Sequence, residues 1–185
     1  TGMIFQRILQ DTRAKESDRL IAANLAGDLT VMNDNLADAL LAIVRSADEP
    51  APLRAKAAIA LGPVLELADV DGFDDPDDVP ITEPRFRSIQ DSLQRVYLDD
   101  STPKEVRRRI LEASVRAPRD WHTNAIEAAY SNGDREWVLT AVFAMQWVSG
   151  FDKQILEALK STDPEIHREA IMAAGDQELD AAWTH

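Results

Sequence analysis

The sequence predicts an all-α fold, a solenoid of about five stacked helix pairs. Three observations support this prediction. The 185 residues include only seven glycines, and helix-favouring residues dominate the composition. Short strings with one pattern of small and apolar residues recur along the chain. An amphipathic segment precedes each string, and residues typical of turns separate the two.

The clearest repeated strings are "RLIAANLAG" from Arg19, "RAKAAIALG" from Arg54 and "HREAIMAAG" from His167. Looser copies begin at Arg107 and Val138. We call these five first residues the anchors and count offsets from them. Small or apolar residues recur at offsets 3, 4 and 6, and offsets 3 and 4 mark one face of a helix. The intervals between anchors are 35, 53, 31 and 29 residues, and three of them suit one helix-turn-helix unit each.

Each anchor string is expected to be the second helix of a pair. Amphipathic segments that begin at residues 3, 36, 86, 121 and 151 are expected to be the first helices. Proline suits the first turn of the helices at Pro103 and Pro164, where the missing N–H costs nothing. Glycine ends the strings at Gly27, Gly62 and Gly175, although "GPVLELA" from Gly62 could continue the helix beyond a proline kink.

The long interval of 53 residues contains an acidic insertion, residues 68–84, with six aspartates. Clustered carboxylates can bind calcium, but this spacing is not that of a calcium-binding loop, since Pro80 stands where such a loop has glutamate. We therefore expect a solvated, mobile insertion. Its apolar residues Phe73 and Ile81 leave open the alternative that it docks on a neighbouring surface.

The string "DEPAPLRAKAAIALG", residues 48–62, resembles a HEAT or HEAT-like repeat of the kind found in phycobilin lyases. Residues 99–115 and 163–175 resemble weaker copies. The resemblance implies a single HEAT-like domain over residues 1–185, folded as a right-handed α–α superhelix. In this family a turn aspartate pairs with the second-helix arginine six residues later to form a ladder between repeats. Asp48 and Arg54 match that pattern.

Composition restricts the classes of function. The net charge of −13 argues against general nucleic-acid binding, which needs an excess of Lys and Arg. The absence of cysteine excludes disulfides, thiolate metal sites and a cysteine nucleophile. No apolar run reaches the length of a membrane span. We therefore expect a cytoplasmic protein without a metal or another cofactor.

We expect a non-catalytic interaction module whose second helices line a concave surface that receives another protein or peptide. Trp137 stands beside charged residues at the start of its helix, so it is expected at the surface as an interface anchor. The residues predicted to contact the partner are Arg54, Arg107, Arg108, Trp137 and His167.

An enzymatic alternative stays open at this point. HEAT-like repeats also occur in lyases that handle phycobilin pigments and in base-excision glycosylases. "RDW", residues 119–121, is faintly similar to the Arg, Asp and Trp that such glycosylases use. A deep pocket around these three residues would favour chemistry or a small ligand.

The C-terminal residues 175–185 suggest the start of a further helix, with Leu179 and Trp183 as its apolar residues. Terminal repeats usually carry polar caps. The sequence leaves open whether the chain is a piece excised from a longer protein.

Overall fold

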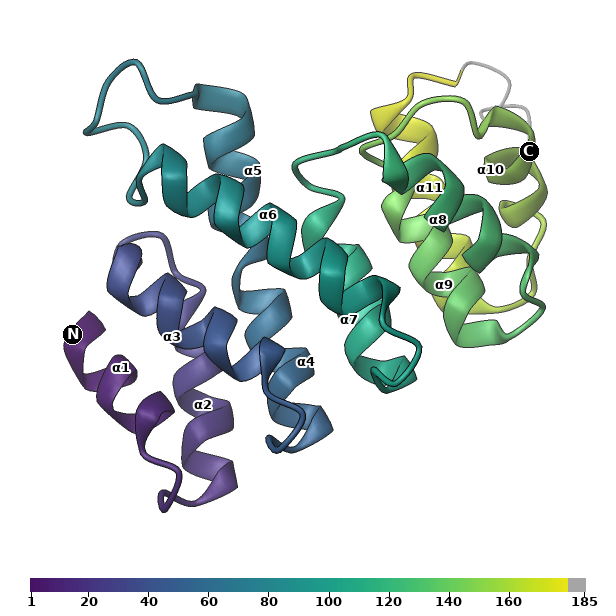
Figure 1. Cartoon of the computed structure of the whole chain (residues 1–185). Coiled ribbons are helices and arrows are strands. Elements are labelled where there is room, and N and C mark those ends of the chain that lie inside the picture. Colours follow the sequence, from purple (N-terminus) through teal and green to yellow (C-terminus); the bar gives the residue numbers. More distant parts are fainter. Residues whose placement is uncertain (180–185) are drawn as a thin grey trace. The chain divides into compact units, whose positions relative to one another are not determined.

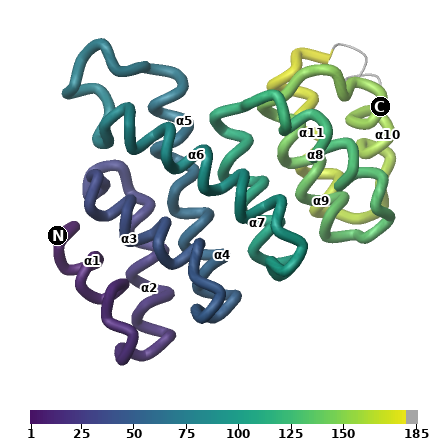
Figure 2. The backbone as a smooth tube through the Cα atoms, in the orientation of Figure 1, coloured from purple at the N-terminus to yellow at the C-terminus, as the bar shows by residue number. Residues whose placement is uncertain are grey.

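A computed structural model describes residues 1–179 and shows only helices joined by turns and loops in that range, so the all-α prediction is confirmed there. The chain divides into two compact units, residues 1–117 and 118–185 (Figures 1 and 2). The first unit contains α1 (Gly2–Gln10), α2 (Glu16–Ala26), α3 (Asp34–Arg45), α4 (Ala51–Ala60), α5 (Gly62–Asp71), α6 (Glu83–Leu98) and α7 (Lys104–Ser114).

The first unit is built from two rows of helices. Helices α1, α3 and α6 pack in one row, since α3 contacts both of the others. Helices α2, α4 and α7 form a second row, in which α4 contacts both neighbours. Each helix of the first row also packs against its partner in the second, as Figure 1 shows for this part of the chain. The predicted pairing of helices is therefore present in this unit.

Very close packing joins the second-row helices. A Cβ built at Gly27 would lie 3.3 Å from the Cα of Ala60, and one built at Gly62 would lie 3.6 Å from the Cα of Ala113. Small residues at these positions let the helix backbones approach one another. Leucines such as Leu40 fill the space between the two rows and are fully buried.

The acidic insertion is shorter than the sequence indicated. Helix α4 ends at Ala60, because Pro63 has no N–H to continue the hydrogen-bond ladder, but α5 then runs on to Asp71. The loop itself spans residues 72–82 (Figure 1). Its four aspartates at positions 74, 75, 77 and 78 are exposed, as expected for a solvated insertion.

The loop nevertheless docks on the first unit through its apolar residues. Ile81 is only 4% exposed, and the ring of Phe73 lies 5.5 Å from that of Phe86 in α6. The backbone N–H and the hydroxyl of Thr82 both donate to the carboxylate of Asp34, at 2.8 and 2.9 Å. The aspartates of the insertion are thus exposed, as expected, while its apolar residues dock, as the alternative described.

The second unit contains α8 (Trp121–Ser131), α9 (Arg135–Ala144), α10 (Asp152–Ala158) and α11 (Pro164–Asp176). Helix α9 contacts the other three helices of this unit. Asp134 and Asp163 cap α9 and α11 by accepting hydrogen bonds from backbone N–H groups of the first turn. Helix α11 ends at Asp176, and Trp183 of the predicted further helix lies outside the described residues.

Candidate binding surface

Four of the five anchors hydrogen-bond the C-terminal end of the first helix in their own pair. The bonded carbonyl belongs in three cases to the second-last residue of that helix and in the fourth to the residue just after it. These bonds are Arg19 Nη2 to Leu9 O (2.7 Å), Arg54 Nε to Val44 O (3.0 Å), Arg107 Nε to Tyr97 O (2.9 Å) and His167 Nδ1 to Leu159 O (2.8 Å).

These bonds explain why the anchor is polar in so apolar a string. The last carbonyls of an α-helix have no partner within the helix, and they form the negative end of its dipole. A cationic donor satisfies the carbonyl and the dipole together. The fifth anchor, Val138, has no such donor. The anchor side chains therefore hold each helix hairpin together.

A second set of contacts runs from one pair to the turn of the next. Arg19 forms a nearly buried ion pair with Glu49, with a nitrogen–oxygen distance of 2.6 Å. Arg135 in α9 donates to the carboxylates of Asp163 and Glu165, the latter at 2.8 Å. The hydrogen bond from Arg135 holds the pKa of Asp163 below its ordinary value.

The predicted ladder arginine, Arg54, follows the same rule. Its positive charge acts on Asp99 in the turn of the following pair. Hydrogen bonds from Ser101 lower the pKa of Asp99 most, and the charge of Arg54 lowers it further. Arg54 is thus attracted over a longer distance to Asp99, whereas the sequence pattern pointed to Asp48.

The residues predicted to contact a partner do not form one exposed patch. Arg54 and Arg108 are buried, at 6% and 5% exposed. Arg107 is half-buried, and its guanidinium lies 5.1 Å from the ring centre of Tyr97. His167 is exposed. Most of these side chains therefore lie within or between helix pairs.

The expectation that Trp137 lies at the surface is wrong, because the side chain is only 9% exposed. Asp134 caps α9 and fixes the register of its first turn. In that register Trp137 shares one helix face with Thr140, Ala141 and Ala144, all of which are buried. A tryptophan in the first turn therefore belongs to the core of the second unit.

In the second-row helices, the side chains at offsets 2 and 5 from each anchor are exposed (Ile21, Asn24 and Ile59) or half-buried (Lys56, Arg109 and Glu112). On a helical wheel these offsets lie opposite offsets 0, 3 and 4, whose side chains face the pair. The sequence analysis missed them, although the repeat register marks their positions. We call the six residues at these offsets in the first unit the second-helix surface: Ile21, Asn24, Lys56, Ile59, Arg109 and Glu112.

The second-helix surface is mixed in character, although the chain is acidic overall. Ile21 is 59% exposed and Ile59 is 38% exposed, which is unusual for isoleucine in a helix that packs on both sides. Arg109 is bound by Glu112 of its own helix at 2.8 Å. Lys56 adds a second cation between the apolar residues. The surface thus combines apolar area with the positive charge of Lys56, since the charge of Arg109 is matched by Glu112.

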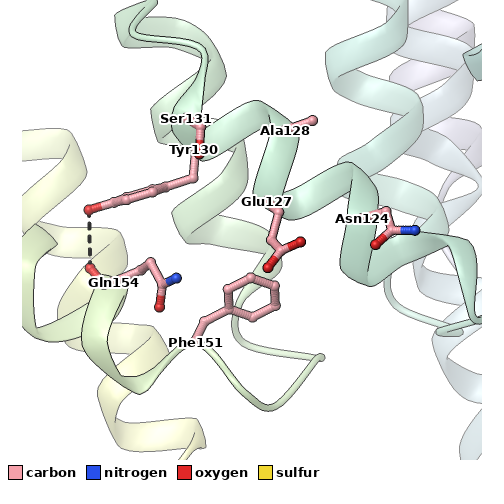
Figure 3. Close-up of a pocket in the computed structure, with 7 residues that line it drawn as sticks. All are labelled: Asn124, Glu127, Ala128, Tyr130, Ser131, Phe151 and Gln154. Atoms are coloured by element: carbon pink, nitrogen blue, oxygen red, sulfur yellow. Dashed lines mark hydrogen bonds between the residues drawn. The ribbon is translucent and has the colours of Figure 1, made fainter.

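A separate cavity of about 380 Å³ lies between α8 and α10 of the second unit (Figure 3). The hydroxyl of Tyr130 donates to the carboxylate of Glu157 at 2.7 Å. Burial raises the pKa of Tyr130, and the hydrogen bond to Glu157 and the charge of Glu157 raise it further. The side chains that line the cavity are carboxylate, amide, hydroxyl, aromatic and methyl groups: Asn124, Glu127, Ala128, Tyr130, Ser131, Phe151 and Gln154. These residues do not include 119–121, which a glycosylase-like site would need.

The residues "RDW" lead into α8: Asp120 is its N-cap and Trp121 its first residue. Asp120 is exposed, and the ring of Trp121 stacks at 3.9 Å on that of His122. The N–H of Arg119 donates to Nδ1 of His122 at 2.8 Å. His122 is fully buried, and burial lowers its pKa to about 4. A neutral imidazole therefore completes the first turn of α8.

Two classes of site find no candidate among residues 1–179. None of the described helices combines the length and apolar character needed to cross a bilayer. No group of three or more His, Asp or Glu side chains in this range is arranged to hold a metal ion.

Comparison of the chain with models of known protein families and with curated protein sequences finds no match.

Proposed function

We propose that this chain is a HEAT-like solenoid and a non-catalytic protein–protein interaction module. It binds an extended segment of a partner protein along the second-helix surface. Two structural features support a solenoid of repeated pairs: the two rows of helices in the first unit, and the contacts from one pair to the turn of the next. Both features are typical of repeat proteins, in which each unit packs on its neighbours.

The exposure of Ile21 and Ile59 is the observation that carries the proposal. Ile21 and Ile59 stand at offsets whose side chains point away from the first helix of their pair. They lie on the neighbouring helices α2 and α4, which pack against each other. Burying such residues against a partner removes apolar area from water, which favours association. Lys56 lies on the same helix face as Ile59 and favours acidic groups on the partner, whereas the charge of Arg109 is already matched by Glu112.

The predicted partner segment therefore carries apolar and acidic side chains. Nucleic acid is a poorer partner, since the chain carries a net charge of −13 that repels phosphate at long range. The absence of cysteine suits a reducing compartment, and we propose the cytoplasm as the place of action. The cavity of Figure 3 gives the enzymatic alternative little support, because its lining lacks histidine, cysteine and lysine.

Selection from a random peptide library tests the proposal. The whole chain is immobilised, displayed peptides of about 12 residues are selected on it, and their affinities are measured in solution. The selected peptides should be enriched in apolar and acidic residues. The double substitution Lys56→Glu and Ile59→Glu should weaken their binding by about tenfold or more, because it removes apolar contact and reverses a charge.

Leu98→Glu is the matched control. Leu98 is 60% exposed at the end of α6, in the other row of helices, so this variant should bind the peptides as the parent does. Failure to select any peptide above background would refute the proposal. Peptides that bind the double variant and the parent equally would refute it as well.

A further inference from the structure

The turn between α8 and α9 contains an asparagine that is followed by a glycine, Asn132 and Gly133. Both residues are exposed, and Gly133 has a φ of 82°. The chain has four other asparagines, and none of them precedes a glycine. Because glycine has no Cβ, it crowds the preceding side chain least and lets the backbone rotate most freely at this point.

The backbone N–H of Gly133 donates to no acceptor within residues 1–179. Gly72, which follows Asp71, provides the contrast. Its φ of 69° is similar, but its N–H donates to the carbonyl of Ala68 at 3.0 Å. A backbone nitrogen that is bonded in this way cannot turn towards a neighbouring side chain without losing its hydrogen bond. The nitrogen of Gly133 is under no such restraint.

The carboxamide of Asn132 is directed towards the backbone that follows it. Its Oδ1 accepts a hydrogen bond from the N–H of Asp134 at 3.3 Å. A donor on this oxygen stabilises the negative charge that the oxygen acquires when a nucleophile attacks Cγ. Asn132 has a φ of −63° and a ψ of −30°, so the attack requires the peptide plane between Asn132 and Gly133 to turn. Glycine permits that motion.

We propose that Asn132 is a site of spontaneous modification, a deamidation that passes through a cyclic imide. The nitrogen of Gly133 forms a bond to Cγ of Asn132, and the bond from Cγ to Nδ2 breaks. The leaving nitrogen takes the proton of the Gly133 N–H and departs as ammonia. Water then attacks either carbonyl of the ring, whose bond to nitrogen breaks, so that nitrogen regains a proton and the new carboxylate releases one. Opening at Cγ gives aspartate, and opening at the main-chain carbonyl gives isoaspartate.

The modification places a new carboxylate in the turn that starts α9. Asp134 in this turn caps α9 by accepting hydrogen bonds from the N–H groups of Glu136 and Trp137. The new carboxylate also stands at the end of α8, where the helix dipole is negative. Each modified copy carries one more negative charge than the parent, so anion-exchange chromatography separates the two.

Peptide mapping by mass spectrometry tests the proposal on the whole folded chain. The chain is kept in warm, mildly alkaline buffer, and samples taken over time are digested with trypsin, which cleaves after Arg119 and Arg135. The peptide between these cuts contains both Asn132 and an internal control, Asn124. Asn124 is also exposed, but it lies inside α8, where the next N–H is bonded within the helix. Asn132 should lose ammonia at least about tenfold faster, because its barrier to ring closure is lower.

Two variants test whether the reaction depends on this pair of residues. Asn132→Gln lengthens the side chain and requires a larger ring, so the slow gain of negative charge should disappear. Gly133→Ala adds a Cβ beside the attacking nitrogen and should slow the reaction by about tenfold, although alanine is strained at a positive φ. Asn132→Gln introduces no such strain, so it decides the test if Gly133→Ala does not fold. Equal rates at Asn132 and Asn124 in the parent would overturn the proposal, and so would a charge gain that persists in Asn132→Gln.

Discussion

The side chain of Arg54 is buried because its guanidinium group has a partner in the preceding helix. Its Nε donates to the carbonyl of Val44, which has no acceptor role left within α3. Burial lowers the pKa of Arg54, and the charge of Asp99 counters part of that effect. The residue therefore contributes to stability through one donated bond and one longer-range attraction.

Arg54→Met should lower the free energy of unfolding by about 1–3 kcal/mol, because it leaves a buried carbonyl without its donor. Urea denaturation followed by circular dichroism measures the change. Arg85→Met is the control: Arg85 pairs with Asp38 at 3.0 Å while both are nearly half exposed, so its loss should cost less than about 1 kcal/mol. Equal losses in the two variants would contradict the assigned role of Arg54.

His122 should make stability depend on pH. Its pKa is near 6.5 in the unfolded chain and about 4 in the folded one, where burial opposes the charged form. Between these values the unfolded chain binds a proton that the folded chain does not. The stabilisation is therefore complete above about pH 6.5 and is lost as the pH falls towards 4, by about 3 kcal/mol in all.

His122→Asn tests this expectation, because asparagine can accept the Arg119 N–H bond but does not titrate. The variant should lose less stability than the parent between about pH 7 and about pH 5 in urea denaturation. An unchanged pH dependence in His122→Asn would exclude His122 as its source.

The repeats in the sequence identified the anchor positions. They did not indicate that the anchor side chains bond the first helix of their own pair and do not face a partner. An arginine in an alanine-rich helix is expected at the surface, because isolated charged side chains are rarely buried. Whether a carbonyl lies within reach depends on where the preceding helix ends, which only the folded hairpin determines. Trp137 was misplaced for a related reason, because the register set by Asp134 turns it inward.

Close contact between helices α2 and α4 depends on Gly27. This residue has ordinary helical dihedral angles, so its role is to leave space and not to allow an unusual turn. The nearest atoms to a Cβ at this position belong to the backbone of Ala60, which cannot rotate away.

Gly27→Val should therefore lower the free energy of unfolding by about 1–3 kcal/mol, as overpacking does in tight cores. Gly175→Ala is the contrasting change, because alanine favours helix and the site has space among the described residues. It should leave stability unchanged or raise it by up to about 1 kcal/mol. Thermal denaturation of both variants measures these effects, and a harmless valine at Gly27 would contradict the close packing.

At this scale the sequence predicted most of the elements. Apolar spacing, proline and capping residues indicated the helix pairs, and "GPVLELA" indicated that a helix continues beyond the break at Leu61. The acidic loop was harder to predict. Its aspartates indicated a solvated segment, but docking depends on the distant partners Asp34 and Phe86.

Four of the five helix pairs repeat the hydrogen bond from the anchor to the first helix, while the residues at offsets 2 and 5 differ from pair to pair. Offset 2 carries Ile21, Lys56 and Arg109 in successive pairs of the first unit. The division into two units at Ala117 was not foreseen from the repeats, and the expected single domain stays a prediction. Repeat proteins that bind a partner typically keep the contacts within each helix pair constant and vary the residues that face the partner.

The central claim is that the anchor residues hold the helix pairs while the residues two and five positions later bind the partner. Measuring both unfolding free energy and affinity for a selected peptide, in the same two variants, tests it directly. Arg54→Met should lose stability and keep its affinity at temperatures where it is folded. The Lys56→Glu and Ile59→Glu double variant should keep its stability and lose affinity. The reverse pattern, or parallel losses in both variants, would contradict the claim.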